Sequence, residues 1–283
     1  MAFASLKSEL KKAQEGKYAI PLFDVFDSYS IDGVFESMII KRAPTILGIY
    51  TSFADQPNIR ALTAYIRSRA KDTDVPISIM LDHGASVEQC KTMLASGFTD
   101  VMYDGSQLPV EQNIINTRNV VEVAHDIGAT VEAELGHVGM GNHYDEFGSK
   151  RLGFTDPSII ERFVAETGVD ILAIAFGNAH GLYKGEPKLD LELVQDVRHK
   201  VDIPLVMHGG TGLSEDQFRG AIQAGICKIN IATMIVNQAK ENIIQRAKSE
   251  NPDYFFILDS IRLAYRDNCS YLYDVFGTTG KVS

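Results

Sequence analysis

The stretch Pro76-Ile-Ser-Ile-Met-Leu-Asp-His-Gly84 is an apolar run that ends abruptly in a carboxylate and an imidazole. A short run of this composition, bounded by proline and glycine, is typical of a buried strand. We therefore predict a strand that delivers Asp82 and His83 at its carboxyl end. Packing alone gives little reason for this polar pair, so the same stretch indicates a functional site.

The same pattern recurs along the chain and alternates with segments of helical periodicity. Seven further strands are predicted at Tyr18–Val25, Thr45–Tyr50, Asp100–Tyr103, Thr130–Leu135, Ile171–Phe176, Pro204–Met207 and Ile226–Ile231. Eight strands that are each followed by a helix, with no hairpin signal, favour a parallel sheet closed into an α/β (β/α)8 TIM barrel. An open doubly wound sheet is the alternative, but the first strand-to-helix turn has no GxGxxG fingerprint.

Three segments lie outside the repeating pattern. An extra helix is predicted at about Ser5 to Gln14, and an aromatic-rich helical tail from Asn251 onward is expected to pack on the barrel or on a second subunit. The glycine-rich segment from Gly136 to Asp156 is either a functional loop or a disordered surface insertion. The length of 283 residues fits one barrel domain over residues 1–283.

Composition excludes several classes of function. The net charge of -10 and the pI near 5.2 argue against a nucleic-acid or anionic-membrane partner, which requires a basic surface. The three cysteines show no CxxC spacing, so neither a disulfide framework nor a thiolate zinc site is expected. We recognise no export signal and no membrane-spanning stretch, and we expect a cytoplasmic protein.

Three of the seven histidines, His83, His180 and His208, fall at the ends of predicted strands. In a barrel these ends share one rim, where active sites lie. Three neutral imidazoles hold Zn²⁺ with positions left open, as in catalytic sites, so we predict a zinc site with Asp82 as its acid/base. Glu134 and Asp104, at two other strand ends, are candidate oxygen ligands or acceptors for the ligands, or else cap or turn residues.

A phosphate site is predicted beside the histidines. The segments Met207–Gly212 and Asn230–Thr233 each lead into a helix, after the seventh and eighth strands, where barrels commonly bind phosphate through backbone N–H groups. Thr211 and Thr233 add hydroxyl donors. Lys184 is a candidate phosphate ligand, with an exposed, solvated side chain as the alternative.

A Lewis acid, an acid/base and a phosphate cradle together suit a ketose phosphate, whose carbonyl and hydroxyl groups can chelate zinc while a carbon–carbon bond breaks. An aldol cleavage through a lysine Schiff base is the alternative route. Lys228 lies within the eighth strand, before its tip, so the metal route is preferred.

Together these motifs resemble the class II, metal-dependent ketose-bisphosphate aldolases, the family of fructose- and tagatose-bisphosphate aldolases. The resemblance rests on Leu81–Gly84, Val131–Gly136, Gly177–Tyr183, His208–Gly212 and Gly225–Thr233. It implies zinc on His83, His180 and His208, an alternative or second metal position at Glu134 and Asp104, and proton transfer by Asp82. It also implies a monovalent cation (Na⁺ or K⁺) and a homodimer or homotetramer. The residues implied for dihydroxyacetone phosphate are Gly181, Gly209, Gly210, Thr211, Asn230, Ile231, Ala232 and Thr233.

Two departures from the family pattern concern the substrate. The first strand ends in Leu22-Phe23-Asp24, where the family usually has Ala-Phe-Asn, and Met140-Gly141-Asn142 stands where adjacent loop acids are usual. Asp145 or Glu146 is the candidate substitute for the loop acid. The aldehyde half of the substrate, such as glyceraldehyde 3-phosphate, and the need for a distal phosphate stay open.

Three hypotheses follow. The first is a zinc-dependent aldolase that reversibly cleaves a ketose 1-phosphate or 1,6-bisphosphate, with an aldolase acting on a non-bisphosphate sugar as a variant. The second is a metal-dependent hydrolase on the same barrel, which commonly needs a His-x-His pair that Phe23-Asp24 does not supply. The third is a non-catalytic sugar-phosphate binder. It is disfavoured because binding alone does not require an acid/base such as Asp82 next to a metal ligand.

Overall fold

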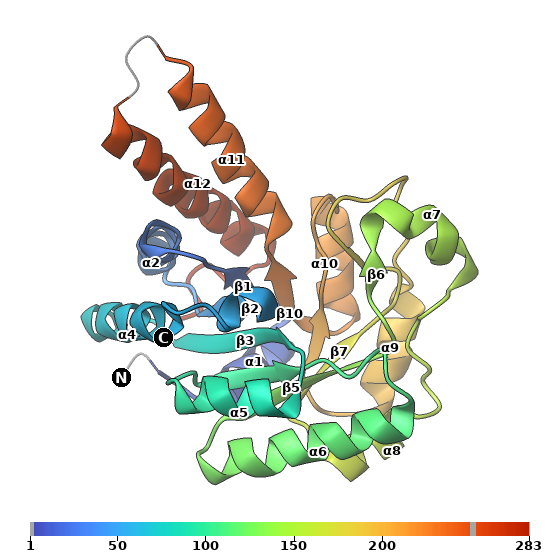
Figure 1. Cartoon of the computed structure of the whole chain (residues 1–283). Helices are drawn as coiled ribbons and strands as arrows, with labels where there is room; N and C mark the ends of the chain where they lie inside the picture. Colours follow the sequence, from blue (N-terminus) through green and yellow to red (C-terminus); the bar gives the residue numbers. More distant parts are fainter. Residues whose placement is uncertain (1–2, 250–252, 283) are drawn as a thin grey trace.

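The structure, a computed structural model, describes residues 3–249 and 253–282. Eight parallel strands close into a barrel in the order β1-β10-β9-β7-β5-β4-β3-β2 (Figure 1). These strands are β1 (Ile20–Asp24), β2 (Thr45–Tyr50), β3 (Ile77–Gly84), β4 (Asp100–Tyr103), β5 (Thr130–Leu135), β7 (Ile171–Ile174), β9 (Leu205–Met207) and β10 (Ile226–Ile231). The predicted barrel is confirmed, and the open doubly wound sheet is wrong.

Four strands are shorter than predicted: β3 and β9 each begin one residue late, whereas β1 and β7 each lose two residues at one end. In β1 and β7, other partners take the backbone groups. The Tyr18 N–H donates to the Ala13 carbonyl in the turn after the first helix, so β1 begins only at Ile20. At the end of β7, the N–H groups of Ala175 and Phe176 donate to side chains instead of to a neighbouring strand. Strand boundaries of this kind depend on contacts that hydrophobic periodicity does not record.

Helices surround the barrel, and their caps explain where several of them begin. Ser86 caps α5, and Ser214 forms a capping box with Gln217 at the start of α10. The helices are α1 (Leu6–Gly16), α2 (Ser28–Lys41), α3 (Thr51–Ala54), α4 (Ile59–Arg69), α5 (Val87–Ala95), α6 (Val110–Asp126), α7 (Tyr144–Phe147), α8 (Ile160–Thr167), α9 (Leu191–Lys200), α10 (Glu215–Ala224), α11 (Thr233–Ala247) and α12 (Tyr254–Val275). Within the described residues, no helix combines the length and apolar composition needed to cross a bilayer.

The predicted helical tail is α12, which lies beside α11 and packs on α2. The two helices extend away from the barrel at the top of Figure 1. Tyr265 and Tyr273 of α12 are buried, whereas Tyr254, Phe255 and Phe256 at its start are exposed. The tail therefore packs on the barrel in part. Asn251 and Pro252, where the predicted tail begins, lie outside the described residues.

The glycine-rich segment after β5 contains short regular elements, so the prediction of a disordered insertion is not met there. Strand β6 (Gly139–Met140) pairs with β8 (Ala179–His180), and α7 follows after a short 3-10 turn. Because β8 ends in His180, the pairing ties this segment to one of the predicted metal ligands.

The contact between α2 and α12 depends on Gly33. A Cβ atom there would lie 2.4 Å from the Arg262 carbonyl oxygen and 2.6 Å from the Tyr265 Cβ. We expect Gly33→Ala to lower the free energy of unfolding by about 1–3 kcal/mol, since the clash outweighs the gain in helix propensity. Urea titration followed by circular dichroism measures the change.

Gly220→Ala is the matched control for this prediction. Gly220 also lies within a helix, but its added methyl group would meet only a Leu191 methyl, at 3.1 Å. We expect a change within about 1 kcal/mol, because a flexible side-chain tip can move. Equal losses in both variants would contradict the packing argument.

Candidate active site

Strand β3 places Asp82 and His83 at its carboxyl end, as predicted. The pairing of β3 with β4 shifts register between Leu81 and Gly84, and His83 has a positive φ of 53°. Such bulges and left-handed residues are common next to active sites, where they redirect side chains. Both side chains are buried, with 4% of Asp82 and 8% of His83 exposed.

The three predicted histidines lie together. The ring centroid of His83 is 4.8 Å from that of His180 and 4.5 Å from that of His208, and the last two are 6.0 Å apart. One ring nitrogen from each lies within 4.8 Å of the others, as in a metal cluster. His83 comes from β3, His180 from β8 and His208 from the loop after β9.

The donor atoms of this cluster fit a divalent metal ion. The Nδ1 of His83 is 2.8 Å from the Asp104 carboxylate, whereas its Nε2 is buried without a hydrogen-bond partner. Burial lowers the pKa values of His180 and His208, so both are neutral imidazoles able to donate a lone pair. An unpartnered nitrogen and two neutral imidazoles match a zinc site with three protein ligands.

The charges around His83 also favour a cation. Burial opposes protonation of this imidazole, but the carboxylates of Asp82, Asp104 and Glu134 outweigh it and raise the pKa of His83 to about 10. Burial and the neighbouring Asp104 raise the pKa of Glu134 to about 8. Carboxylates that raise the pKa of a neighbouring imidazole in this way also favour a bound metal ion, because either one brings positive charge into the site.

Asp104 and Glu134 form a second possible cluster with His83. Asp104 accepts a hydrogen bond from the Ser106 N–H through one oxygen, and its other oxygen faces His83. It therefore stabilises the turn after β4 and also contacts a predicted metal-binding histidine. Glu134 accepts from the Val138 N–H, and its other oxygen is buried without a partner, 4.0 Å from the Nδ1 of His83. Their roles as metal ligands stay predictions.

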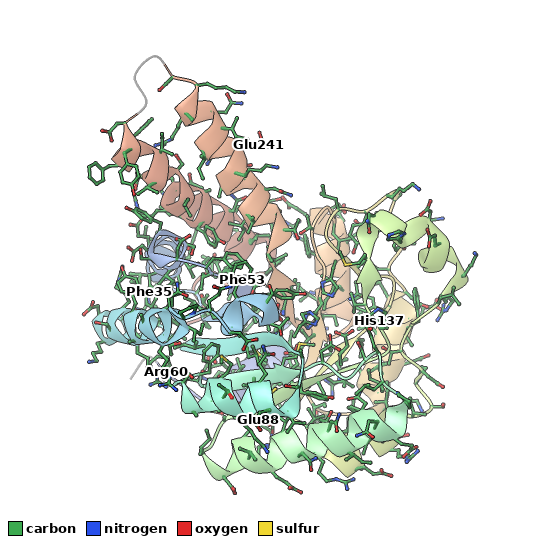
Figure 2. All side chains as sticks on the ribbon, in the orientation of Figure 1. Phe35, Phe53, Arg60, Glu88, His137 and Glu241 are labelled. Atoms are coloured by element: carbon green, nitrogen blue, oxygen red, sulfur yellow. The ribbon has the colours of Figure 1, made fainter. Side chains whose placement is uncertain are left out.

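A cavity of about 780 Å³ opens over the histidines. Phe53 of α3 and His137 of the segment after β5, both labelled in Figure 2, are among the residues that line it. Its wall also includes most of the predicted phosphate residues: Gly181, Gly209, Gly210, Thr211, Asn230, Ala232 and Thr233.

The glycine loop of this wall approaches the β8 backbone closely. Gly209 has a φ of 71°, and a Cβ atom there would lie 2.1 Å from the Ala179 carbonyl oxygen. Only glycine fits this position. The Tyr183 hydroxyl donates to the Gly209 carbonyl and accepts from the Ala179 N–H, which fixes the loop against the strand that carries His180.

Besides Glu134, four predicted residues do not line the cavity. Lys184 pairs with Asp145 at 2.8 Å and lines a separate cavity instead, because the β6–β8 pairing holds both residues on the outer segment. Glu146 lies 3.1 Å from His143, on the exposed side of this segment. Ile231 is a buried residue of β10. The structure therefore does not bring Lys184 to the phosphate loops or Asp145 and Glu146 to Asp82.

The sequence analysis did not predict the roles of two buried residues beside the histidine cluster, Glu132 and Lys228. Glu132 accepts a hydrogen bond from His208 Nε2, and Lys228 pairs with Glu132 at 2.8 Å. The signal was present, because Glu132 lies two residues before Glu134, and Lys228 two before Asn230, so each pair shares one face of a strand. Asp24 also lines the cavity, and burial and the Asp82 charge raise its pKa.

The fold and the site together define a (β/α)8 barrel with a histidine and carboxylate cluster at the carboxyl ends of its strands. Enzymes of this fold carry their active sites at that end. Lys228, the one lysine considered for a Schiff base, is fully buried between Glu132 and Asn230 and does not line the cavity.

Comparison with known proteins identifies the family. Residues 4–281 match the family model "Fructose-bisphosphate aldolase class-II". A fructose-bisphosphate aldolase of Geobacillus stearothermophilus is 39% identical over 236 residues, which is 82% of each chain. The crystal structure of the YdjI aldolase from Escherichia coli K12 is 30% identical, with a TM-score of 0.88 over 99% of this chain and 100% of that one. Fructose-bisphosphate aldolase from Campylobacter jejuni shares the fold, with a TM-score of 0.81 at 19% identity over 98% of this chain and 96% of that one.

The chain belongs to the class II fructose-bisphosphate aldolase family. It is therefore a carbon–carbon lyase that acts on a sugar phosphate, in a family that is generally metal-dependent. The resemblance drawn from the motifs is confirmed. Family membership decides against the hydrolase and the non-catalytic binder as the main activity.

We expect His180→Ala to abolish most metal binding, because a catalytic zinc site needs three protein ligands. The readout is the zinc content of the dialysed protein by atomic emission, with thermal unfolding before and after chelation. Chelation is expected to destabilise the wild type and to leave the variant unchanged, since only a protein that binds metal is stabilised by it. His143→Ala, at an exposed loop histidine, is the control and should keep the wild-type zinc content. Equal zinc contents in the two variants would exclude His180 as a ligand.

Proposed function

We propose that the protein is a zinc-dependent aldolase that reversibly cleaves a ketose 1-phosphate or 1,6-bisphosphate of the fructose or tagatose type. The products are dihydroxyacetone phosphate and an aldehyde such as glyceraldehyde 3-phosphate. The observation that carries the proposal is the cluster of His83, His180 and His208 beside Asp82, within one cavity. When bound there, zinc supplies a Lewis acid that polarises the ketose carbonyl.

Asp82 is the proposed proton-transfer residue. It lines the cavity next to the histidine cluster, and its Oδ1 accepts a 2.7 Å hydrogen bond from the Asn230 amide. A carboxylate held in this way can take the proton from the substrate hydroxyl that becomes the aldehyde, and return it in the synthetic direction.

The phosphate of the dihydroxyacetone half is assigned to the loops after β9 and β10. Gly209, Gly210 and Thr211 line one side, and Thr233 begins α11 on the other. The N-cap residue of α11, Ala232, makes no side-chain cap, which leaves N–H donors at this helix end for an anion. Gly181 lines the same cavity, and a monovalent cation beside the phosphate stays a prediction.

The oligomeric state, the cellular location and the aldehyde half of the substrate form the remaining parts of the proposal. The exposed aromatic residues Tyr254, Phe255 and Phe256 support a homodimer or homotetramer, since an apolar patch of this kind is typical of an interface. The single domain over residues 1–283 and the cytoplasmic location stay predictions, as does the zinc role of Asp104 and Glu134. The aldehyde half stays open, with a non-bisphosphate sugar as the alternative substrate.

Asp82→Asn tests the acid/base role. Asparagine keeps an oxygen for the Asn230 hydrogen bond but cannot accept a proton, so we expect kcat to fall about 10²- to 10⁴-fold with zinc content unchanged. Cleavage of fructose 1,6-bisphosphate, coupled to reduction of dihydroxyacetone phosphate, gives the rate. Asp202→Asn, at an exposed aspartate paired with Lys11, is the control. Equal turnover by Asp82→Asn and the wild type would remove Asp82 from the mechanism.

The position of the phosphate is tested with three ketoses. Because the phosphate loops lie beside the histidine cluster, we expect cleavage of fructose 1-phosphate and fructose 1,6-bisphosphate but not of fructose 6-phosphate. Dihydroxyacetone phosphate from the first two sugars is measured by the coupled assay, and glyceraldehyde 3-phosphate, the phosphorylated product that cleavage of fructose 6-phosphate would give, is measured for the third. Inorganic phosphate is measured in parallel. Release of inorganic phosphate without dihydroxyacetone phosphate would support the hydrolase instead.

A further inference from the structure

Lys228 lies inside the barrel, where a charged side chain is unusual. It belongs to β10, pairs in register with Ile20 of β1 and Val206 of β9, and has 0% of its surface exposed. A buried ammonium is unfavourable unless it is paired and hydrogen-bonded. Its partners therefore indicate what it does.

Lys228 has two buried partners. Its Nζ lies 2.8 Å from Glu132 Oε2 and donates a 2.7 Å hydrogen bond to Asn230 Oδ1. Beyond Lys228, the other Glu132 oxygen contacts His208 Nε2 at 2.8 Å, and the Asn230 amide donates to Asp82 Oδ1 at 2.7 Å. Lys228 thus lies at the middle of a chain that connects the proposed metal ligand to the proposed base.

The chemistry of the partners fixes each orientation. A carboxylate only accepts hydrogen bonds, so Glu132 selects the tautomer of His208 that carries its proton on Nε2 and leaves Nδ1 unprotonated, 3.3 Å from the Asn230 amide nitrogen. Lysine only donates, so Lys228 fixes the Asn230 oxygen toward itself and the Asn230 amide toward Asp82. Glu132 therefore acts on His208 and Asn230 acts on Asp82, and Lys228 contacts both Glu132 and Asn230.

We propose that Lys228 and Glu132 are positioning residues: through Glu132 they set the tautomer of His208 for metal binding, and through Asn230 they orient Asp82 for proton transfer. This inference rests on the proposed function and assigns a role to two residues that touch neither substrate nor metal. The chain spans the barrel interior, because β5, which carries Glu132, and β3, which carries Asp82, are not neighbours of β10. It thus couples the metal ligand to the base.

The test uses the variants Lys228→Met, Glu132→Gln and the double variant Glu132→Gln/Lys228→Met. Lys228→Met leaves Glu132 as an uncompensated buried charge and is at risk of unfolding. The double variant removes both charges and keeps a glutamine oxygen for His208. Lys7→Met is the control. It breaks a lysine–carboxylate pair of the same 2.8 Å length, between Lys7 and Asp170, and Asp170 directly precedes β7. Zinc affinity is measured by competition with a chromogenic chelator.

The expected results separate the two roles. In Glu132→Gln, the glutamine cannot accept from both His208 and the ammonium, so zinc affinity falls about 10- to 100-fold. In the double variant, glutamine faces His208 alone, so zinc affinity recovers to within about threefold of the wild type. The kcat stays about 10- to 100-fold low, because the Asn230 oxygen has lost the donor that orients its amide toward Asp82. If the two residues had a purely structural role, thermal stability would fall, but zinc affinity would not recover in the double variant while kcat stays low. Equal kcat in the double variant and the wild type would overturn the inference. It would also be overturned if the loss of zinc affinity in the double variant equalled the product of the losses in the two single variants.

A second measurement does not depend on the metal. In ¹⁵N-labelled metal-free protein, the ring nitrogens of His208 are expected to show the Nε2–H tautomer in the wild type and a mixture of tautomers in Glu132→Gln. Absence of the Nε2–H tautomer from the wild type would overturn the inference. If the wild type binds no zinc or makes no dihydroxyacetone phosphate, the proposed function fails, but the tautomer still tests the positioning role.

Discussion

The site depends on an excess of buried negative charge at the carboxyl ends of the strands. Asp82 and Glu134 are buried beside His83, and Asp104 is half-buried and faces it. A buried charge without a partner is strongly unfavourable. Without a metal, the site balances these charges by binding protons, as the raised pKa of about 10 at His83 shows. A divalent ion replaces protons with a fixed charge. Burying these carboxylates without a positive charge beside them is unfavourable, and for the same reason they favour a bound metal ion.

Much of this arrangement follows from the sequence because a parallel barrel aligns the ends of its strands. His83 lies 97 residues before His180, and His180 lies 28 residues before His208. Each nevertheless follows an apolar strand pattern, and closure of the barrel brings the three side chains to one rim. No such rule governs Lys184, which lies in an irregular segment. Its side chain pairs with Asp145 because β6 and β8 run side by side, a contact that no local pattern announces.

The sequence predicts which charged residues are buried inside the barrel, but not which of them pair with one another. A period of two along a strand places Glu132 with Glu134, and Lys228 with Asn230, on the inward face, so the sequence indicates which charges are buried. It does not indicate that Glu132 meets Lys228. Strands β5 and β10 are separated by β7 and β9 in the barrel, and only closure of the sheet puts these two side chains 2.8 Å apart.

The same period of two makes the end of β3 a special case. In a regular strand, Asp82 and His83 would point to opposite faces, and only one of them would reach the cavity. The register shift between Leu81 and Gly84, with the left-handed φ of 53° at His83, breaks the alternation and lets both side chains line the cavity. A base and a metal ligand that are adjacent in sequence therefore require a bulge. The backbone irregularity is a condition of the chemistry, because a straight strand would separate the two groups.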